Sequence, residues 1–222
     1  MVFFHLNVLK AQKPEKPQNT VFGIQLSPII PNNLLENNEV VVDHDTTVFQ
    51  LGQKPGISFG MEIRSSFSNW LALQYGINLM KRNYTLDVEH NDSLINGNLG
   101  LLCYEIPVSG LVYARITKWL YMNAAFGISF SFYPSDVFIH EMLYAQRQSW
   151  VQPALKMNVG FEIRTENSGA FYLGASYDRM FFNLYKMYAQ QPDGAIGEHI
   201  KFMEKGSYFS VNFKYFFPII KD

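Results

Sequence analysis

The sequence predicts an all-β fold: an eight-stranded antiparallel up-and-down transmembrane β-barrel with short periplasmic turns and long extracellular loops. Two patterns predict it. Eight segments alternate large apolar residues with small or polar ones, at the period of two that a strand requires. Short and long connections follow these segments in strict alternation. Outer-membrane barrels have short turns on the periplasmic side and longer loops outside the cell.

The composition fits a single membrane-embedded domain. The chain has 222 residues, of which 16% are aromatic and 17% charged, whereas soluble domains carry about 25% charged residues. The mean hydropathy is −0.06, and no segment approaches the roughly 18 consecutive apolar residues of a membrane-spanning helix. The sequence therefore argues against a helical membrane protein and for one folded unit.

Charge and cysteine content exclude further classes of protein. Lys and Arg number 18 against 19 Asp and Glu, a formal net charge of −1, so no nucleic-acid partner is expected. A single cysteine, Cys103, allows neither an internal disulfide nor a thiolate metal cluster. No cofactor is expected.

The eight expected strands share one alternation of side chains. In the sixth, Leu155, Met157 and Val159 alternate with polar residues and glycine. Several segments exceed the usual length of strands in soluble sheets, and a tilted strand of about 9–11 residues crosses a bilayer. The expected strands cover residues 21–30, 57–64, 71–80, 102–115, 119–132, 151–164, 170–179 and 208–217.

The connections give the barrel its orientation. Those after the second, fourth and sixth strands are short and polar, as in β-hairpins. The even number of strands puts both ends of the barrel, expected over residues 20–218, on the short-turn side. The long connections are residues 31–56, 81–101, 133–150 and 180–206.

Residue size indicates which face of the barrel is outside. Alternation alone leaves a soluble ligand-binding barrel open, because such a barrel turns its apolar face inward. Here the polar face carries glycines and charges of both signs, which suit a narrow lumen. The large residues of the other face would crowd that interior, so we expect them to contact lipid. The charged residues that then project into the lumen are Glu62, Arg64, Glu105, Lys156, Glu162, Arg164, Asp178 and Lys214.

These lumen charges are expected to form a paired network that closes the lumen, because buried charges need partners of opposite sign. Replacing Glu62 or Glu162 should then destabilise the barrel without altering conductance. An ion pathway or a proton-linked gate is the alternative interpretation.

All three tryptophans occur at the starts of expected strands. Trp70 and Trp119 follow short turns, and Trp150 follows a long connection. Outer-membrane barrels carry aromatic girdles at both membrane interfaces. The three tryptophans are therefore expected to mark both edges of the lipid band.

The first residues resemble the end of a secretory signal. An apolar run over residues 2–9 is followed by Ala11, a small residue of the kind found at cleavage sites. No basic segment precedes the run. We therefore expect residues 1–12 to be a signal peptide truncated at its start, and residues 13–19 to be a periplasmic segment.

Three marks make the chain resemble the Bacteroidota-type outer-membrane β-barrel proteins, the PorT-like or "outer membrane protein β-barrel domain" group. They are the signal end Lys10-Ala11-Gln12, the phrase Tyr104-Glu105-Ile106-Pro107-Val108, similar to the family's LEIPLL, and the final aromatics Phe213, Tyr215 and Phe217. The resemblance implies location in the outer membrane of a Gram-negative-type cell. The final aromatics resemble the signal read by the barrel-assembly machinery, which is then a partner during biogenesis.

Family members include accessory parts of the type IX secretion and gliding apparatus. The resemblance therefore implies a structural or partner-binding role, as an accessory subunit of an outer-membrane complex for secretion, gliding or assembly. Outer-membrane lipid and one or more proteins are the expected partners, and no enzymatic activity is expected. Because a fold does not assign a function, a rim-active lipid-modifying enzyme and a small channel stay open as alternatives.

The long connections hold the residues on which those alternatives depend. Histidines near acidic residues would suit a metal or acyl-transfer site at the rim. No Ser/His/Asp spacing stands out, and loops collect polar residues in any case, so no catalytic or metal residue is assigned. Apolar stretches at 40–51 and 137–145 are expected to form folded caps or a docking surface. The four histidines are His44, His90, His140 and His199.

Overall fold

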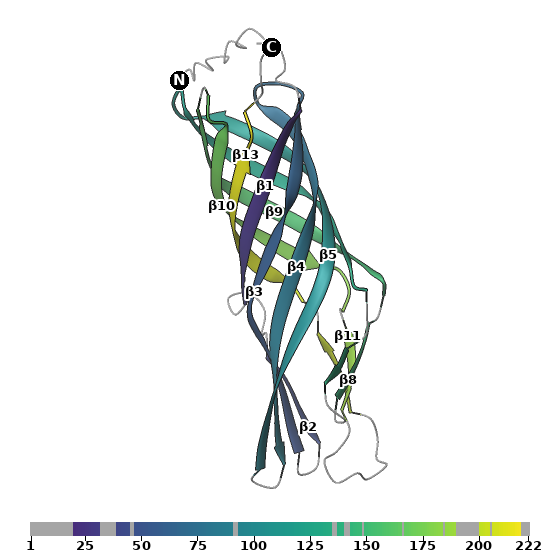
Figure 1. Cartoon of the computed structure of the whole chain (residues 1–222). Coiled ribbons are helices and arrows are strands. Elements are labelled where there is room, and N and C mark those ends of the chain that lie inside the picture. Colours follow the sequence, from purple (N-terminus) through teal and green to yellow (C-terminus); the bar gives the residue numbers. More distant parts are fainter. Residues whose placement is uncertain are drawn as a thin grey trace, which may run out of the picture.

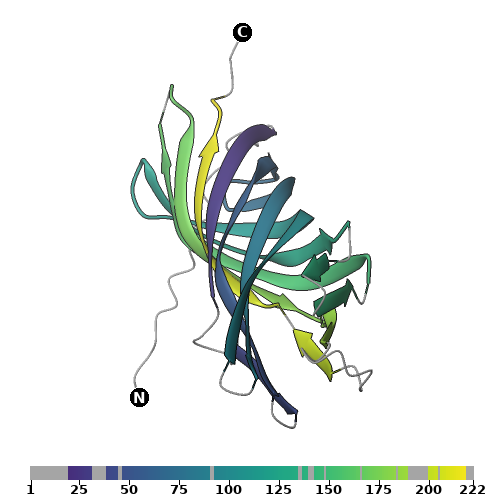
Figure 2. The ribbon, with the colours of Figure 1, turned by 60° about the horizontal axis from the view of Figure 1, so that its bottom comes forward.

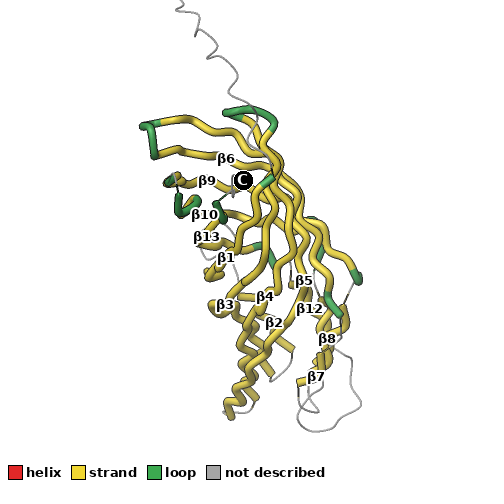
Figure 3. Tube along the Cα trace, turned by 45° about the horizontal axis from the view of Figure 1, so that its top comes forward, coloured by secondary structure: helices red, strands yellow, loops and turns green. Residues whose placement is uncertain are grey.

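The structure, a computed structural model, contains only strands and their connections as described elements (Figure 3). Among the described residues there is no helix long and apolar enough to span a membrane. The described residues are 20–31, 39–44, 47–90, 93–134, 137–139, 143–147, 149–165, 167–183, 185–189, 200–204 and 206–218.

Eight strands close into an antiparallel barrel (Figure 1), which confirms the predicted fold class. The order around the barrel is β1-β3-β4-β5-β6-β9-β10-β13, and β1 pairs with both β3 and β13. Figure 2 shows this closure, with β1 in purple beside β13 in yellow. The barrel strands are β1 (Val21–Ile30), β3 (Thr47–Ser66), β4 (Leu71–His90), β5 (Ser93–Arg115), β6 (Leu120–Phe132), β9 (Val151–Arg164), β10 (Ala170–Met180) and β13 (Tyr208–Phe216).

Three of these strands are much longer than the membrane is thick. β3 and β4 have 20 residues each and β5 has 23. A strand of 20 residues is roughly 65 Å long and, at a tilt of about 40°, rises roughly 50 Å, against an apolar band of about 25 Å. β3, β4 and β5 therefore continue beyond the barrel as an extension, which Figure 1 shows at the bottom.

The long connections are present as predicted, and much of their described length is strand. β2 pairs with β3 in the extension, while four other strands form a separate sheet in the order β12-β11-β8-β7. β12 lies beside β2, and β7 lies beside β5. The additional strands are β2 (Glu39–His44), β7 (Val137–Ile139), β8 (Leu143–Arg147), β11 (Tyr185–Ala189) and β12 (Ile200–Glu204).

Hydroxyl side chains close the short turns at the other end. Ser68 Oγ accepts the backbone N–H of Leu71 at 3.1 Å, and Thr117 Oγ1 accepts that of Leu120 at 3.0 Å. Ser and Thr favour turns because their hydroxyls can bond to nearby backbone in this way. In the third turn Gly169 has a φ of +80°, a conformation that glycine adopts without steric cost.

The two faces of the barrel wall have opposite polarity. On β1, Phe22, Ile24 and Leu26 point outward and are exposed, whereas Gln25 and Ser27 point inward and are buried. A closed barrel with an apolar outer face satisfies its backbone hydrogen bonds within the wall and can lie in lipid. The predicted assignment of the apolar face to the outside is therefore correct.

The faces exchange polarity in the extension. Along β4, Lys81 is the first exposed charge on the outward face, and Glu89 is exposed near the strand's end. On the inward face of the same stretch, Tyr84, Leu86 and Val88 are buried. A strand with apolar residues inside and polar residues outside is typical of sheets that stand in water. The exchange at Lys81 therefore marks the extracellular edge of the lipid band.

Candidate functional site

The barrel lumen is a candidate site because it gathers the buried charges of the described chain. The eight charged residues considered for the lumen lie on inward-facing positions of β3, β5, β9, β10 and β13, where most of them are fully buried. They form three layers of contacts between the short-turn rim and the extension.

The layer nearest the short turns is centred on Glu162. Its carboxylate accepts hydrogen bonds from Arg64 Nη1 at 2.7 Å and from Arg164 Nε at 2.6 Å. The Arg164 guanidinium also stacks over Tyr121, 4.1 Å from the ring centroid, and that of Arg64 stacks over Phe216 at 3.6 Å. Two cations, one carboxylate and two rings thus fill this end of the lumen.

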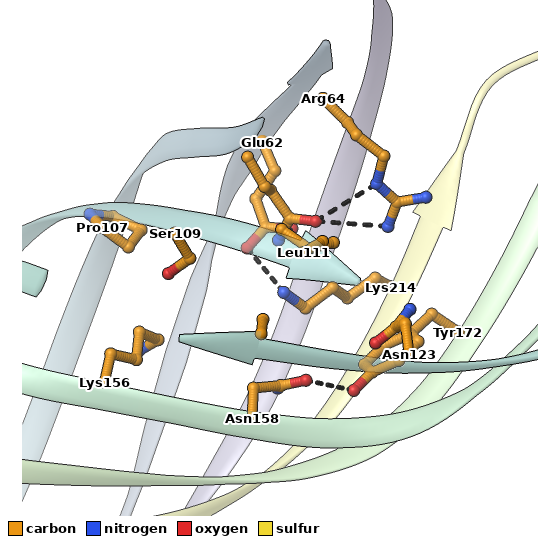
Figure 4. A pocket seen from close by; sticks show the side chains of 12 residues that line it. Glu62, Arg64, Pro107, Ser109, Leu111, Asn123, Lys156, Asn158, Tyr172 and Lys214 are labelled. Atoms are coloured by element: carbon orange, nitrogen blue, oxygen red, sulfur yellow. Dashed lines mark hydrogen bonds and ion pairs between the residues drawn. The ribbon is translucent and has the colours of Figure 1, made fainter. Parts of the chain in front are cut away.

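The middle layer joins Glu62 to Lys214 (Figure 4). Lys214 Nζ lies 2.8 Å from Glu62 Oε1, and Gln74 Nε2 donates to Glu62 Oε2 at 2.7 Å. Gln74 Oε1 accepts hydrogen bonds from Arg64 at 3.2 and 3.3 Å, which connects this layer to the one nearest the short turns. Both oxygens of the buried Glu62 carboxylate are therefore satisfied, as a buried charge requires.

The layer nearest the extension places one lysine between two carboxylates. Lys156 Nζ lies 3.0 Å from both Glu105 Oε1 and Asp178 Oδ1. Asn78 Nδ2 donates to Glu105 at 2.9 Å, and the Tyr208 hydroxyl donates to the same carboxylate at 3.3 Å. The two carboxylates outnumber the cation, and the neutral donors supply the remaining hydrogen bonds.

Glycines make room for the largest side chain of the middle layer. Tyr172 donates a hydrogen bond to Asn158 (Figure 4). A Cβ at Gly174 or at Gly160 would clash with the Tyr172 hydroxyl oxygen. The remaining lumen cavity between these layers has a volume of about 20 Å³, enough for roughly one water molecule.

A ring of buried, mostly apolar residues closes the lumen at its extracellular end. Its members come from seven of the eight barrel strands or the residue directly following one: Ile29, Met80, Cys103, Tyr133, Ala154, Met180 and Tyr208.

Sequence reasoning missed Arg82, which lies buried at this end. Its side chain is 1% exposed, and its guanidinium lies 5.7 Å from the ring centroid of Tyr84 and 5.0 Å from that of Tyr208. Among the described residues, none of its three nitrogens has a carboxylate partner. The period of two could have identified Arg82. Beyond Met80 it continues through Tyr84 and Leu86, with apolar residues on the inward face, and Arg82 lies on that face.

Arg82 leaves the described lumen with one positive charge in excess. The other eight residues balance, with four cations and four carboxylates. The cations are Arg64, Arg82, Lys156, Arg164 and Lys214, and the carboxylates are Glu62, Glu105, Glu162 and Asp178.

The three tryptophans lie at both ends of the lipid-facing wall. Trp70 and Trp119 are 58% and 54% exposed in the short turns, and Trp150 is 64% exposed just before β9, at the opposite end. These are positions at which indole rings can reach a membrane interface.

The aromatic residues at the end of the barrel sequence face outward along β13. Phe213 and Phe217 are 48% and 46% exposed, and the Tyr215 ring lies 5.1 Å from that of Phe217. The Phe217 N–H donates to the Phe22 carbonyl at 2.8 Å, which ties the end of β13 to the start of β1.

Several predicted features lie outside the described residues. These include the expected signal peptide over 1–12, the segment 13–19, and the side chains of all four loop histidines. Backbone register does place His44 opposite Thr47, and Thr47 opposite His90. Where side chains are described, no group of three or more His, Cys, Asp and Glu could hold a metal ion.

Comparison with solved structures supports the architecture. The chain is similar to the crystal structure of the outer membrane protein OprG from Pseudomonas aeruginosa, with a TM-score of 0.61 over 90% of this chain and 97% of that chain. The chain is an outer-membrane β-barrel. At 11% sequence identity the likeness extends to the fold alone.

Comparisons of sequence do not assign the chain to a family. No model of a known protein family matches the chain, so the PorT-like resemblance stays a prediction. The chain is 26% identical over 131 residues to N-acetyl-gamma-glutamyl-phosphate reductase of Caldicellulosiruptor saccharolyticus, a match covering 55% of this chain and 36% of the reductase. The chain thus spans about a third of that relative's length, and the match shows no family membership.

Proposed function

We propose that this barrel has a structural or partner-binding role, as an accessory subunit of an outer-membrane complex serving secretion, gliding or barrel assembly. The extension of β3, β4 and β5 carries this proposal. It continues the barrel wall well beyond the lipid band and has a buried apolar inner face of its own. A sheet held above the membrane is suited to contact another protein, because it presents surface outside the lipid.

Two exposed apolar side chains favour a protein contact on this extension. Val41 on β2 and Leu94 on β5 are 54% and 63% exposed. The strand register puts both on the outward face, which otherwise presents polar side chains such as Glu89 and Asn96. Apolar residues within a polar surround are typical of protein interfaces.

The filled lumen favours this role over the small channel. Three layers of paired side chains and the buried ring at the extracellular end leave a cavity of about 20 Å³ between the charged layers. A hydrated ion pathway needs a continuous column of water, which eight-stranded barrels filled with side chains do not have.

Affinity purification from outer membranes tests the proposal. The tagged full-length barrel is extracted in a mild detergent, and co-purifying proteins are quantified by mass spectrometry. We expect a stoichiometric set of partners with the wild-type barrel, and loss of these partners with Leu94→Glu. Lys118→Glu, a charge change in an exposed short turn at the opposite end, should retain them. Recovery of the wild-type barrel alone would contradict the proposal.

A further inference from the structure

An apolar groove of about 460 Å³ lies on the outer wall of the barrel. Ligand pockets have volumes of about 300–1,000 Å³, so the groove is large enough for a small molecule or a single hydrocarbon chain. The outer wall of a barrel is generally convex, and a groove of this size there requires side chains that stand apart. It crosses the outward faces of β3, β1, β13, β10, β9 and β6.

The groove is built from two neighbouring rows of outward residues. In the first row, cross-strand pairing joins Leu120, Ile163, Phe171, Tyr215 and Ile24. The rings of Phe171 and Tyr215 are in contact, with centroids 4.9 Å apart.

The second row runs parallel to the first, one step further from the short turns. Pairing joins Phe161, Leu173, Phe213, Leu26 and Phe59. Across the two rows, the outward side chains that line the groove are all uncharged, and five of them are aromatic rings. Three inward-facing residues also border it: Gln25, Tyr172 and Lys214. The outward part of the lining therefore fits a flexible hydrocarbon.

The groove lies in the half of the wall next to the short turns. Leu120 is the first residue of β6 and follows Trp119, which is 54% exposed at the short-turn rim. Phe171 is the second residue of β10. Because short turns are periplasmic in outer-membrane barrels, the groove opens into the periplasmic leaflet.

We propose that this groove binds one acyl chain of a phospholipid in the periplasmic leaflet. Lipid is the medium that faces this wall, and an unfilled groove would deprive its ring faces of van der Waals contacts. Within a bilayer, packing of this kind distinguishes one apolar contact from another, since lipid tails are as apolar as the side chains. A chain that fills the groove should thus be held more firmly than the lipids along the remaining wall.

Native mass spectrometry tests this site. The full chain is reconstituted in vesicles of palmitoyl-oleoyl phosphatidylglycerol, extracted in mild detergent and washed, and retained lipids per barrel are counted. Leu173→Trp fills the groove from the second row. Val112→Trp is the matched control, because Val112 is 51% exposed on β5 against 53% for Leu173, faces lipid, and lies outside the groove.

We expect the wild-type barrel and Val112→Trp to retain one phospholipid, and Leu173→Trp to retain none. Folding of each variant is checked by its heat-dependent migration on gels. Phe171→Ala, which removes a ring from the first row without filling the groove, should lower retention at least several-fold. Equal retention by Leu173→Trp and the wild type, or no retention by the wild type, would overturn the proposal.

Discussion

The buried charges of this barrel differ in whether the described residues include a partner of opposite sign. Glu62 is 2% exposed and bonded to Lys214 and Gln74. Arg82 is 1% exposed and lies among tyrosine rings. Removing one member of a buried pair leaves the other uncompensated, whereas replacing a buried charge without a counter-charge by an apolar residue relieves a desolvation cost. Substituting Glu62 and substituting Arg82 should therefore change the free energy of unfolding in opposite directions.

For the paired charge, we predict that Glu62→Ala lowers the free energy of unfolding by about 3–5 kcal/mol. Adding Lys214→Met should recover most of the loss, because the stranded ammonium is then also removed. Urea unfolding in lipid vesicles measures both. Glu89→Ala, which removes an exposed carboxylate on β4, should change stability by no more than about 0.5 kcal/mol. A double variant as unstable as Glu62→Ala would show that the two charges do not depend on each other.

For Arg82, we predict that Arg82→Met raises the free energy of unfolding, because it removes a buried charge that has no carboxylate partner among the described residues. Methionine is unbranched, flexible and apolar, and it suits the neighbouring ring of buried residues. The same unfolding assay measures the effect. Arg64→Met is the comparison, because Arg64 is paired with Glu162 and its loss should lower the free energy of unfolding. Lower stability of Arg82→Met would contradict the assignment of an uncompensated charge.

At the scale of elements, the exchange of faces along β4 separates a lipid-facing stretch from one that faces water. Ile77 is 49% exposed within the lipid band, and Thr85 lies on the same face of the strand beyond Lys81. We predict that Ile77→Arg costs about 2–4 kcal/mol of folding free energy in vesicles and that Thr85→Arg costs about 0–1 kcal/mol. Similar costs at both positions would place the membrane edge elsewhere.

The alternation of apolar and polar residues predicted the part of each strand that lies in the membrane. It did not predict the extension, where the apolar residues change from the outward to the inward face. β9 has the bounds expected from sequence, Val151–Arg164, because its outward residues stay apolar throughout. β4 continues ten residues beyond its expected end at Met80, since a pattern with apolar residues outside no longer holds there. Arg82 was assigned to a connection for this reason. Pairings such as Arg64 with Glu162 also lay beyond sequence reasoning, because alternation gives the face of a residue but not its neighbour across the lumen.

At the scale of the whole molecule, the chain combines a membrane barrel with a sheet whose apolar side chains face inward and whose polar side chains face outward, as in a soluble protein. The barrel has a charged, filled interior, and the extension has an apolar one. The two share β3, β4 and β5, which run from the barrel into the extension as continuous strands. This construction suits anchoring and contact, and it does not depend on passage through the lumen.

Single-channel recording in planar lipid bilayers tests the closed lumen most directly. With the purified barrel inserted, we expect no current steps above those of the bare bilayer, and none with Glu162→Ala, which should lower stability but leave the buried ring at the extracellular end in place. A porin recorded in parallel confirms that insertion and detection work. Reproducible steps of uniform conductance from the wild-type barrel would contradict the closed lumen and favour the small channel.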